Sequence, residues 1–226
     1  MRRPSPWIGW LCLVLAGLGT GRGGAEEPTP PSIKVPVDDL PAAFRDRVRA
    51  VLEHPTIVTR APADTFACKP AQYYEFLDHP DLAVAAWRKL GAKCVSIADR
   101  GKGQFGWTDD RGGDVHWDLI LSDPKTRVWY AEGQARPKPL LPMVHFEAIV
   151  VLHITEGRDA SGKTTIRHQA ELAAHSDNKA AALVARLLGP SAPRAAEQYV
   201  TQLQMFLSAL SWYCYQHPDE LEKPGK

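Results

Sequence analysis

One segment of the sequence has the spacing of a nucleotide-binding loop. Gly157 to Thr164 reads Gly-Arg-Asp-Ala-Ser-Gly-Lys-Thr and follows an apolar run. A Walker A motif needs a helix that starts at the Lys and Thr, because backbone N–H groups at the helix start hold the phosphates. Here Thr165 and Ile166 continue as β-rich sequence, and the helical sequence after about Ala174 leaves no room for a parallel sheet. We interpret the segment as a hairpin turn and expect no nucleotide partner.

The eight histidines show none of the spacings that place two metal ligands on one helix face. His116, His153 and His168 lie on predicted strands and could meet in space. Exposed or hydrogen-bonded histidines are the more common arrangement where no motif is present. The sequence therefore predicts no metal site and no cofactor.

Three carboxylates, Asp118, Glu132 and Glu147, also lie on predicted strands. Each could act as a general acid or base if it faced a cavity, whereas salt bridges to Arg127 or Arg167 are the more common use. The sequence contains no Gly-x-Ser-x-Gly elbow and no cysteine in a nucleophile context. We therefore predict no catalytic residue.

Aromatic residues alternate with basic residues in the middle of the chain, as they do in surfaces that stack nucleic-acid bases. The aromatic residues are Trp107, Trp117, Trp129 and Tyr130. The formal net charge is only +1, so the chain carries no strong field that attracts nucleic acid. We expect no nucleic-acid partner.

The first 25 residues have the three parts of a secretory signal peptide. Arg2 and Arg3 precede an apolar stretch from Trp7 to Leu18, and small residues lead to Ala25. The apolar stretch is too short for a permanent membrane anchor, although an uncleaved anchor is the alternative. We expect export to the periplasm or the extracellular space, with no stable membrane span after the signal is removed.

The rest of the chain has the length and the 44% hydrophobic content of one packed domain. Five prolines between Glu26 and Pro41 predict a mobile linker. The predicted divisions are a signal peptide (1–25), a Pro-rich linker (26–41), an N-terminal helix (42–55), the main domain (56–217) and a disordered tail (218–226).

Within the main domain, periodicity and turn residues predict an α+β order. An interrupted edge strand comes first, with pieces at 56–59 and 65–68, and two short helices follow between Pro70 and Gly91. Short turns then separate strands that we expect to pair antiparallel. These strands are expected at 94–98, 104–108, 115–121, 127–132, 146–154 and 164–172, with turns at 99–103, 109–113, 122–125 and 157–162 and a longer loop at 136–142.

Helices are predicted for the last part of the chain, at 179–188 and, after a break at Gly189-Pro190, at 194–216. The apolar side chains of the final helix form one stripe, while Gln204 and Ser208 lie largely off that stripe. Such a helix needs a sheet to pack against. The expected stripe contains Ala196, Tyr199, Leu203, Phe206, Leu207, Leu210, Tyr213 and Cys214.

This element order resembles the helix-grip architecture of the START-like superfamily, also called SRPBCC, from about Thr56 to Gln216. The resemblance is one of order and not of a diagnostic motif. Segments such as 74–80 and 129–133 also resemble uncharacterised bacterial exported proteins. The resemblance implies a curved antiparallel sheet of about six or seven strands wrapped on the long C-terminal helix, with two short helices after the first strand.

In that superfamily a cavity between sheet and helix usually holds an apolar or amphipathic molecule. The resemblance therefore makes five residues candidates for lining a cavity, with a solid core as the alternative. The break at Gly189-Pro190 departs from the pattern and could narrow the cavity mouth. The candidates are Trp117, Leu119, Tyr199, Leu203 and Phe206.

Of the four cysteines, Cys12 lies in the predicted signal. The resembled topology puts the first strand beside the second, so we expect a disulfide between Cys68 and Cys94 that stabilises by roughly 3 kcal/mol. Cys214 is expected to be a buried thiol, and three reduced core cysteines are the alternative.

We expect an exported binding or carrier domain for a lipid-like or aromatic small molecule, without chemistry of its own. One alternative is a cyclase- or hydrolase-type enzyme that uses a cavity carboxylate or histidine, which would show a strongly shifted pKa. Another alternative is a structural or interaction domain without a ligand.

Overall fold

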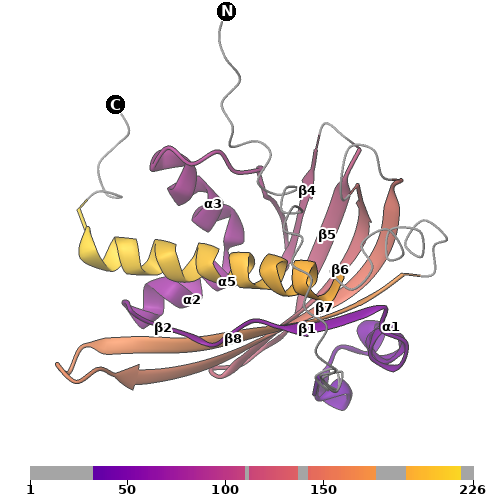
Figure 1. Cartoon of the computed structure of the whole chain (residues 1–226), viewed down its shortest axis with the longest axis horizontal. Coiled ribbons are helices and arrows are strands. Elements are labelled where there is room, and N and C mark those ends of the chain that lie inside the picture. Colours follow the sequence, from indigo (N-terminus) through magenta and orange to yellow (C-terminus); the bar gives the residue numbers. More distant parts are fainter. Residues whose placement is uncertain (1–32, 110–111, 137–141, 177–191, 220–226) are drawn as a thin grey trace, which may run out of the picture.

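The structure is a computed structural model that describes residues 33–109, 112–136, 142–176 and 192–219. One antiparallel sheet bends beside a long C-terminal helix, α5 (Ala192–Gln216), and Figure 1 shows strands β4, β5 and β6 standing up next to that helix. This arrangement is the helix-grip architecture in the α+β class, as predicted.

The sheet has eight strands in the order β1-β8-β7-β6-β5-β4-β3, and β2 also pairs with β8. All pairings among the described strands are antiparallel, and short turns join β3 to β4, β5 to β6 and β7 to β8. The strands are β1 (Ile57–Arg60), β2 (Asp64–Ala67), β3 (Ala98–Gly101), β4 (Gln104–Thr108), β5 (Asp114–Ser122), β6 (Thr126–Ala135), β7 (Val144–Arg158) and β8 (Thr164–His175).

The segment with Walker A spacing is a β-hairpin turn, as predicted. β7 continues to Arg158 and β8 starts at Thr164, so a strand stands where a phosphate-binding helix would have to begin. Asp159 organises the turn, because its Oδ1 accepts hydrogen bonds from the Ser161 hydroxyl and from the backbone N–H groups of Ser161 and Lys163. These bonds lower the pKa of Asp159.

The two faces of the sheet carry different helices. Val48 and Val51 of α1 (Ala42–Glu53) pack with Ile149 and Val151 of β7. Leu152 of β7 points to the opposite face and packs with Val200 of α5. We call these the α1 face and the α5 face.

The segment that precedes α1 is packed and not a free linker from Ile33 onward. Leu40 is 1% exposed in the core of the α1 face, and Ile33, Val35 and Val37 pack against that core. A short 3-10 helix, η2 (Val37–Asp39), fits these apolar residues onto the sheet. The linker prediction is therefore wrong for residues 33–41, and its earlier part lies outside the described residues.

Two short helices, α2 (Pro70–Asp78) and α3 (Pro80–Lys89), follow the first strands, as predicted. They lie beside α5. Phe76 of α2 and Ala83 of α3 form a small core with Leu210 and Cys214 of α5. The predicted strand at 94–98 is wrong, because β3 starts only at Ala98 and occupies part of the predicted turn. Gly101, Lys102 and Gly103 have φ angles of 81°, 56° and 78° and form the tight turn into β4.

The predicted Cys68–Cys94 disulfide is absent, because both side chains are free thiols. The expectation placed the first strand beside the second. In the structure β2, which Cys68 follows, pairs with β8, whereas β3, which Cys94 precedes, ends the other edge of the sheet. Burial raises the pKa of Cys68 to about 11, so this thiol stays protonated.

Among the described helices, none has the length and apolar content needed to cross a membrane. The predicted helix at 179–188 and the break at Gly189-Pro190 lie outside the described residues, as does the predicted signal peptide.

Candidate functional site

The apolar side chains that the sequence named for a cavity lie on the α5 face. Trp117 and Leu119 of β5 are on this face, because Leu119 is opposite Trp129 and Trp129 packs with the core that contains Val200. The ring of Trp117 stacks on Phe105 of β4 at 6.2 Å between centroids. Trp117 and Leu119 are both only partly buried.

The final helix carries a second part of this apolar surface. Tyr199, Leu203, Phe206 and Leu210 are spaced four, three and four residues apart, so they share one stripe of α5. Leu210 is fully buried, and Phe206 packs on Trp87 of α3 at 5.6 Å between ring centroids. Tyr199 and Leu203 remain 41% and 46% exposed. The stripe is thus packed in the C-terminal half of α5 and largely exposed in its N-terminal half.

A buried polar side chain of α5 contacts the sheet beside the apolar residues Val200 and Leu207. Gln204 is 2% exposed, and its side chain accepts a hydrogen bond from the N–H of Ala170 at 2.8 Å and donates one to the carbonyl of Pro62 at 2.8 Å. Ser208 and Ser211 are buried on the same side. Gln204 and Ser208 lie off the predicted apolar stripe and are nevertheless buried. Leu207 of the apolar stripe packs on this core, whereas Tyr199 and Leu203 remain exposed.

A buried histidine also lies on the α5 face. The side chain of His168 is enclosed by Phe66 and Tyr73, and its Nδ1 is 2.7 Å from the Tyr73 hydroxyl. Burial lowers the pKa of His168 to about 4, against the opposing effect of Asp64, whose carboxylate is 3.8 Å from Nε2. This histidine is therefore neutral at neutral pH, and its place inside the core makes it a structural residue.

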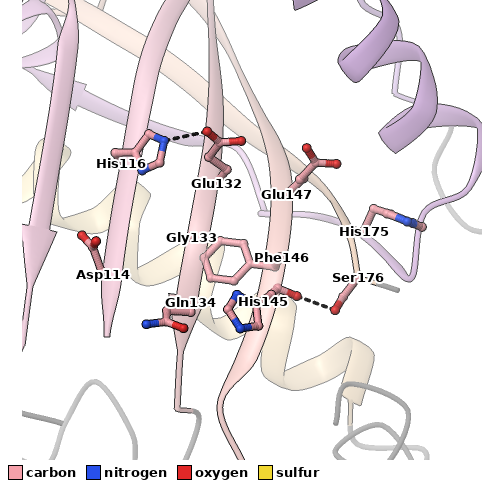
Figure 2. A pocket seen from close by; sticks show the side chains of 10 residues that line it. All are labelled: Asp114, His116, Glu132, Gly133, Gln134, His145, Phe146, Glu147, His175 and Ser176. Atoms are coloured by element: carbon pink, nitrogen blue, oxygen red, sulfur yellow. Dashed lines mark hydrogen bonds and ion pairs between the residues drawn. The ribbon is translucent and has the colours of Figure 1, made fainter. Parts of the chain in front are cut away.

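On the opposite, α1 face, a hollow of about 640 Å³ opens over the ends of β5, β6, β7 and β8 (Figure 2). Neighbouring strands bring its side chains together, because His116 is opposite Glu132, Glu132 opposite Glu147, and Glu147 opposite His175. The lining residues are Asp114, His116, Glu132, Gly133, Gln134, His145, Phe146, Glu147, His175 and Ser176.

The charged side chains at this hollow are paired with one another. Arg47 of α1 forms ion pairs with Glu132 and Glu147, and His116 Nε2 is 2.7 Å from Glu132 Oε1. The Tyr130 hydroxyl donates a hydrogen bond to Glu147. Burial and this bond raise the pKa of Tyr130, so it remains a donor. The network tethers α1 to the sheet.

Glu132 and Glu147 form salt bridges, the more common use expected for the strand carboxylates, but their partner is Arg47 and not Arg127 or Arg167. Asp118, Glu132 and Glu147 lie on the α1 face and not beside α5, so they cannot act in a cavity between the sheet and the final helix. Their expected partner Arg127 pairs instead with Asp78 of α2 at 3.1 Å.

The three strand histidines do not meet either. His153 pairs with Glu171 and His116 with Glu132, whereas His168 lies on the other face.

Arg47 is the residue of this network that sequence reasoning missed. Arg45, Arg47 and Arg49 appear as the solvent-facing side of a helix, since nothing in a helical period tells which charged side chain meets a sheet. The carboxylates Glu132 and Glu147 within apolar strand sequence were the available signal, but they do not name the partner.

No protein-family model matches the sequence, and no curated protein is similar to it at a significant level. Among solved structures, a conserved protein from Geobacillus kaustophilus matches with 13% identity and a TM-score of 0.46, covering 68% of this chain and 95% of that chain. A hypothetical protein from Helicobacter pylori matches with 11% identity and a TM-score of 0.44, covering 82% and 99%.

A truncated norcoclaurine synthase from Thalictrum flavum matches with 16% identity and a TM-score of 0.36, covering 66% of this chain and 92% of that chain. Since all three TM-scores are low, these similarities say nothing about ligand or activity.

Proposed function

We propose that the chain is a binding domain of the START-like type that holds an apolar or amphipathic small molecule between α5 and strands β4 to β6. The observation that carries this proposal is that the N-terminal half of the apolar stripe, in particular Leu203, is exposed, while Trp117 and Leu119 are partly exposed on the face of the sheet that α5 covers. In the view of Figure 1 this half of α5 points toward the upright strands β5 and β6.

Physical chemistry supports an apolar ligand at this place. An exposed leucine or tryptophan gains about 25 cal/mol for each Å² that a ligand removes from water. Binding sites for small molecules are mostly lined by such side chains, with few polar groups. The hydrogen bonds of Gln204 and the packing of Val200 and Leu207 hold α5 in place without using Leu203, so the exposed N-terminal half of the apolar stripe is left available for a ligand.

The direct test compares two arginine substitutions on one helix. Leu203→Arg should abolish the fluorescence increase of the probe 1-anilinonaphthalene-8-sulfonate, because it puts a charge into the proposed site. Met205→Arg is the matched control, since Met205 is 55% exposed on the opposite side of α5 and should leave probe binding unchanged. Equal loss in both variants, or no binding by the wild-type chain, would contradict the proposal.

We also propose that the chain is exported and that residues 1–25 are removed. The basic start, the apolar stretch and the small residues before Glu26 support this proposal. Intact mass measurement of the protein purified from periplasmic, culture-medium and cytosolic fractions tests it. A mature protein that starts at Glu26 is the expected result, and an uncleaved chain in the cytosolic fraction would contradict it.

A further inference from the structure

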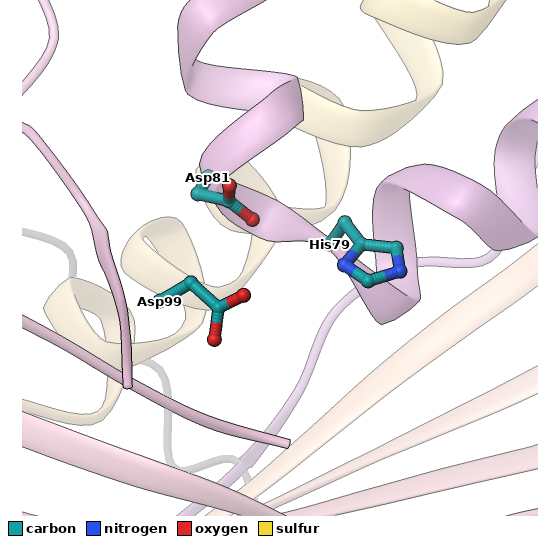
Figure 3. A group of neighbouring side chains, drawn as sticks. All are labelled: His79, Asp81 and Asp99. Carbon is teal, nitrogen blue, oxygen red and sulfur yellow. The ribbon is translucent and has the colours of Figure 1, made fainter. Parts of the chain in front are cut away.

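Three side chains that the fold brings together away from both faces have the donor atoms of a metal site. His79, Asp81 and Asp99 each offer one ligand atom, and these atoms all lie within 4.8 Å of one another. Figure 3 shows the two carboxylates and the imidazole converging from different elements. We propose that these residues bind a divalent transition-metal ion, with Zn²⁺ as the best match.

The backbone positions of these residues are fixed by ordinary helix and strand geometry. His79 ends α2 and precedes α3, and Pro80 occupies the first position of α3. Asp81 therefore lies in the first turn of α3, where the helix N-terminus stabilises its negative charge. Asp99 belongs to β3, at the end of the sheet order.

Asp81 supplies an independent indication of a ligand. Its Oδ1 atom is buried and has no hydrogen-bond partner among the described residues. A buried carboxylate oxygen without a partner costs free energy, and a bound cation removes that cost. The Asp99 carboxylate differs from that of Asp81 in having a hydrogen-bond partner, because its Oδ1 accepts a hydrogen bond from the Gly101 N–H at 2.7 Å. That bond orients the Asp99 carboxylate from outside the site, as a second shell does in metal centres.

The donor set selects the class of ion. One imidazole nitrogen with two carboxylate oxygens suits Zn²⁺, whereas Ca²⁺ and Mg²⁺ prefer oxygen donors only. Zinc–ligand bonds are about 2.0–2.2 Å long, and the exposed side chains of His79 and Asp99 can rotate to bring their donor atoms to that distance from one ion. Three protein ligands leave one coordination position open to solvent.

A metal ion at this position would hold the edge of the sheet to the helices. β3 is exposed along its whole length and pairs with β4 at the edge of the sheet. A metal ion shared by Asp99 and the α2–α3 junction would tie this edge strand to the helices. Zinc should therefore protect backbone amides of β3 from hydrogen exchange, which is a readout independent of ligand binding beside α5.

The experiment titrates Zn²⁺ into the untagged, chelator-treated chain by calorimetry. One Zn²⁺ per chain and a raised melting temperature are expected. His79→Gln and Asp99→Asn should each weaken binding at least about tenfold. Both replaced side chains are exposed, so the variants should fold.

His54→Gln is the matched control, because His54 is an exposed histidine that ends α1 as His79 ends α2. It should bind Zn²⁺ like the wild-type chain.

Three results would overturn the proposal: no Zn²⁺ binding by the wild-type chain, unchanged affinity in both site variants, or loss of binding in His116→Gln. The last result would assign the metal to the hollow on the α1 face. None of these results bears on probe binding by Leu203→Arg, so the two proposals fail separately.

Discussion

At the scale of single residues, the polar groups buried in the α5-face core are the most sensitive points of this molecule. His168 has a side-chain exposure of 0% and makes its hydrogen bond through Nδ1 to Tyr73, while Nε2 has no hydrogen-bond partner among the described residues and lies 3.8 Å from the Asp64 carboxylate. Burial in the core disfavours the charged imidazolium form of this side chain and leaves the neutral imidazole form favoured. Stability at this point should therefore depend on pH.

Acid should destabilise the wild-type chain through His168. Its pKa is about 4 in the folded chain and 6.5 when unfolded, so the unfolded state binds more protons between these values. The contribution is fully present above pH 6.5 and is lost as pH falls through 4. Urea unfolding at several pH values should show a steeper loss of free energy in this window for the wild-type chain than for His168→Gln. Parallel curves would contradict this assignment.

At the scale of elements, the position of α5 on the sheet depends on Gln204, a polar side chain outside the apolar stripe of the helix. The Gln204 side chain accepts a hydrogen bond from the N–H of Ala170 in β8 and donates one to the carbonyl of Pro62. These contacts set the rotation of the helix, and the rotation decides that Leu203 is exposed.

Gln204→Leu should lower the free energy of unfolding by about 1–3 kcal/mol, because it leaves buried backbone groups unsatisfied. Gln202→Leu, on the exposed side of the same helix, should change it little. Chemical denaturation of both variants measures the difference. A similar effect in the two variants would mean that Gln204 does not anchor α5.

A close backbone approach between β5 and β6 requires glycine at residue 133. A Cβ on Gly133 would clash with the carbonyl oxygen of Asp114 and lie 2.8 Å from the Cα of Val115, both backbone atoms that cannot rotate away. The two strands are in register there, since Gly133 is opposite Val115. The backbones of β5 and β6 can approach this closely beside the hollow only because residue 133 has no Cβ.

Gly133→Ala should therefore destabilise by about 1–3 kcal/mol, as overpacking does. Gly157→Ala is its control, because Gly157 is also a strand glycine, and its Cβ would meet only the Thr165 side chain at 3.4 Å. Thermal unfolding of the two variants tests the comparison. A Gly133 variant as stable as the Gly157 variant would show that the strands can separate at no cost.

At the scale of the whole molecule, the sheet is covered on both faces by segments from opposite ends of the chain. The N-terminal segment and α1 cover one face, and α5 covers the other. The hydrogen bonds of β1 and β2 to β8 then close the domain between its first and last strands. The residues before α1 are thus part of the fold.

Leu40→Ala should cost about 2–5 kcal/mol, the range for a buried leucine, since Leu40 is 1% exposed. Leu82→Ala is the comparison at a site that is 43% exposed and should cost far less. Guanidinium unfolding of both variants measures this. Equal effects would indicate that the segment before α1 contributes nothing to stability.

Much of the fold was predictable, because helices, hairpins and turns follow from local patterns. The site was less predictable. Trp117 and Leu119 could be named from alternation along one strand, whereas Arg47 needs the partner strands to be known. His79 and Asp99 come together only when the α2–α3 junction meets the sheet edge, and no spacing in the sequence signals that contact.

The sequence by itself determined the order of elements, the hairpin at 157–164 and the amphipathic character of α5, because these depend on neighbours within a few residues. Tertiary structure alone decided that the first strands pair with the last strand and that Cys68 and Cys94 are far apart in the sheet order. It also decided that Glu132 and Glu147 lie on the α1 face of the sheet, the face that α5 does not cover. The physical reason is that alternation along a strand separates two faces but does not say which helix covers each.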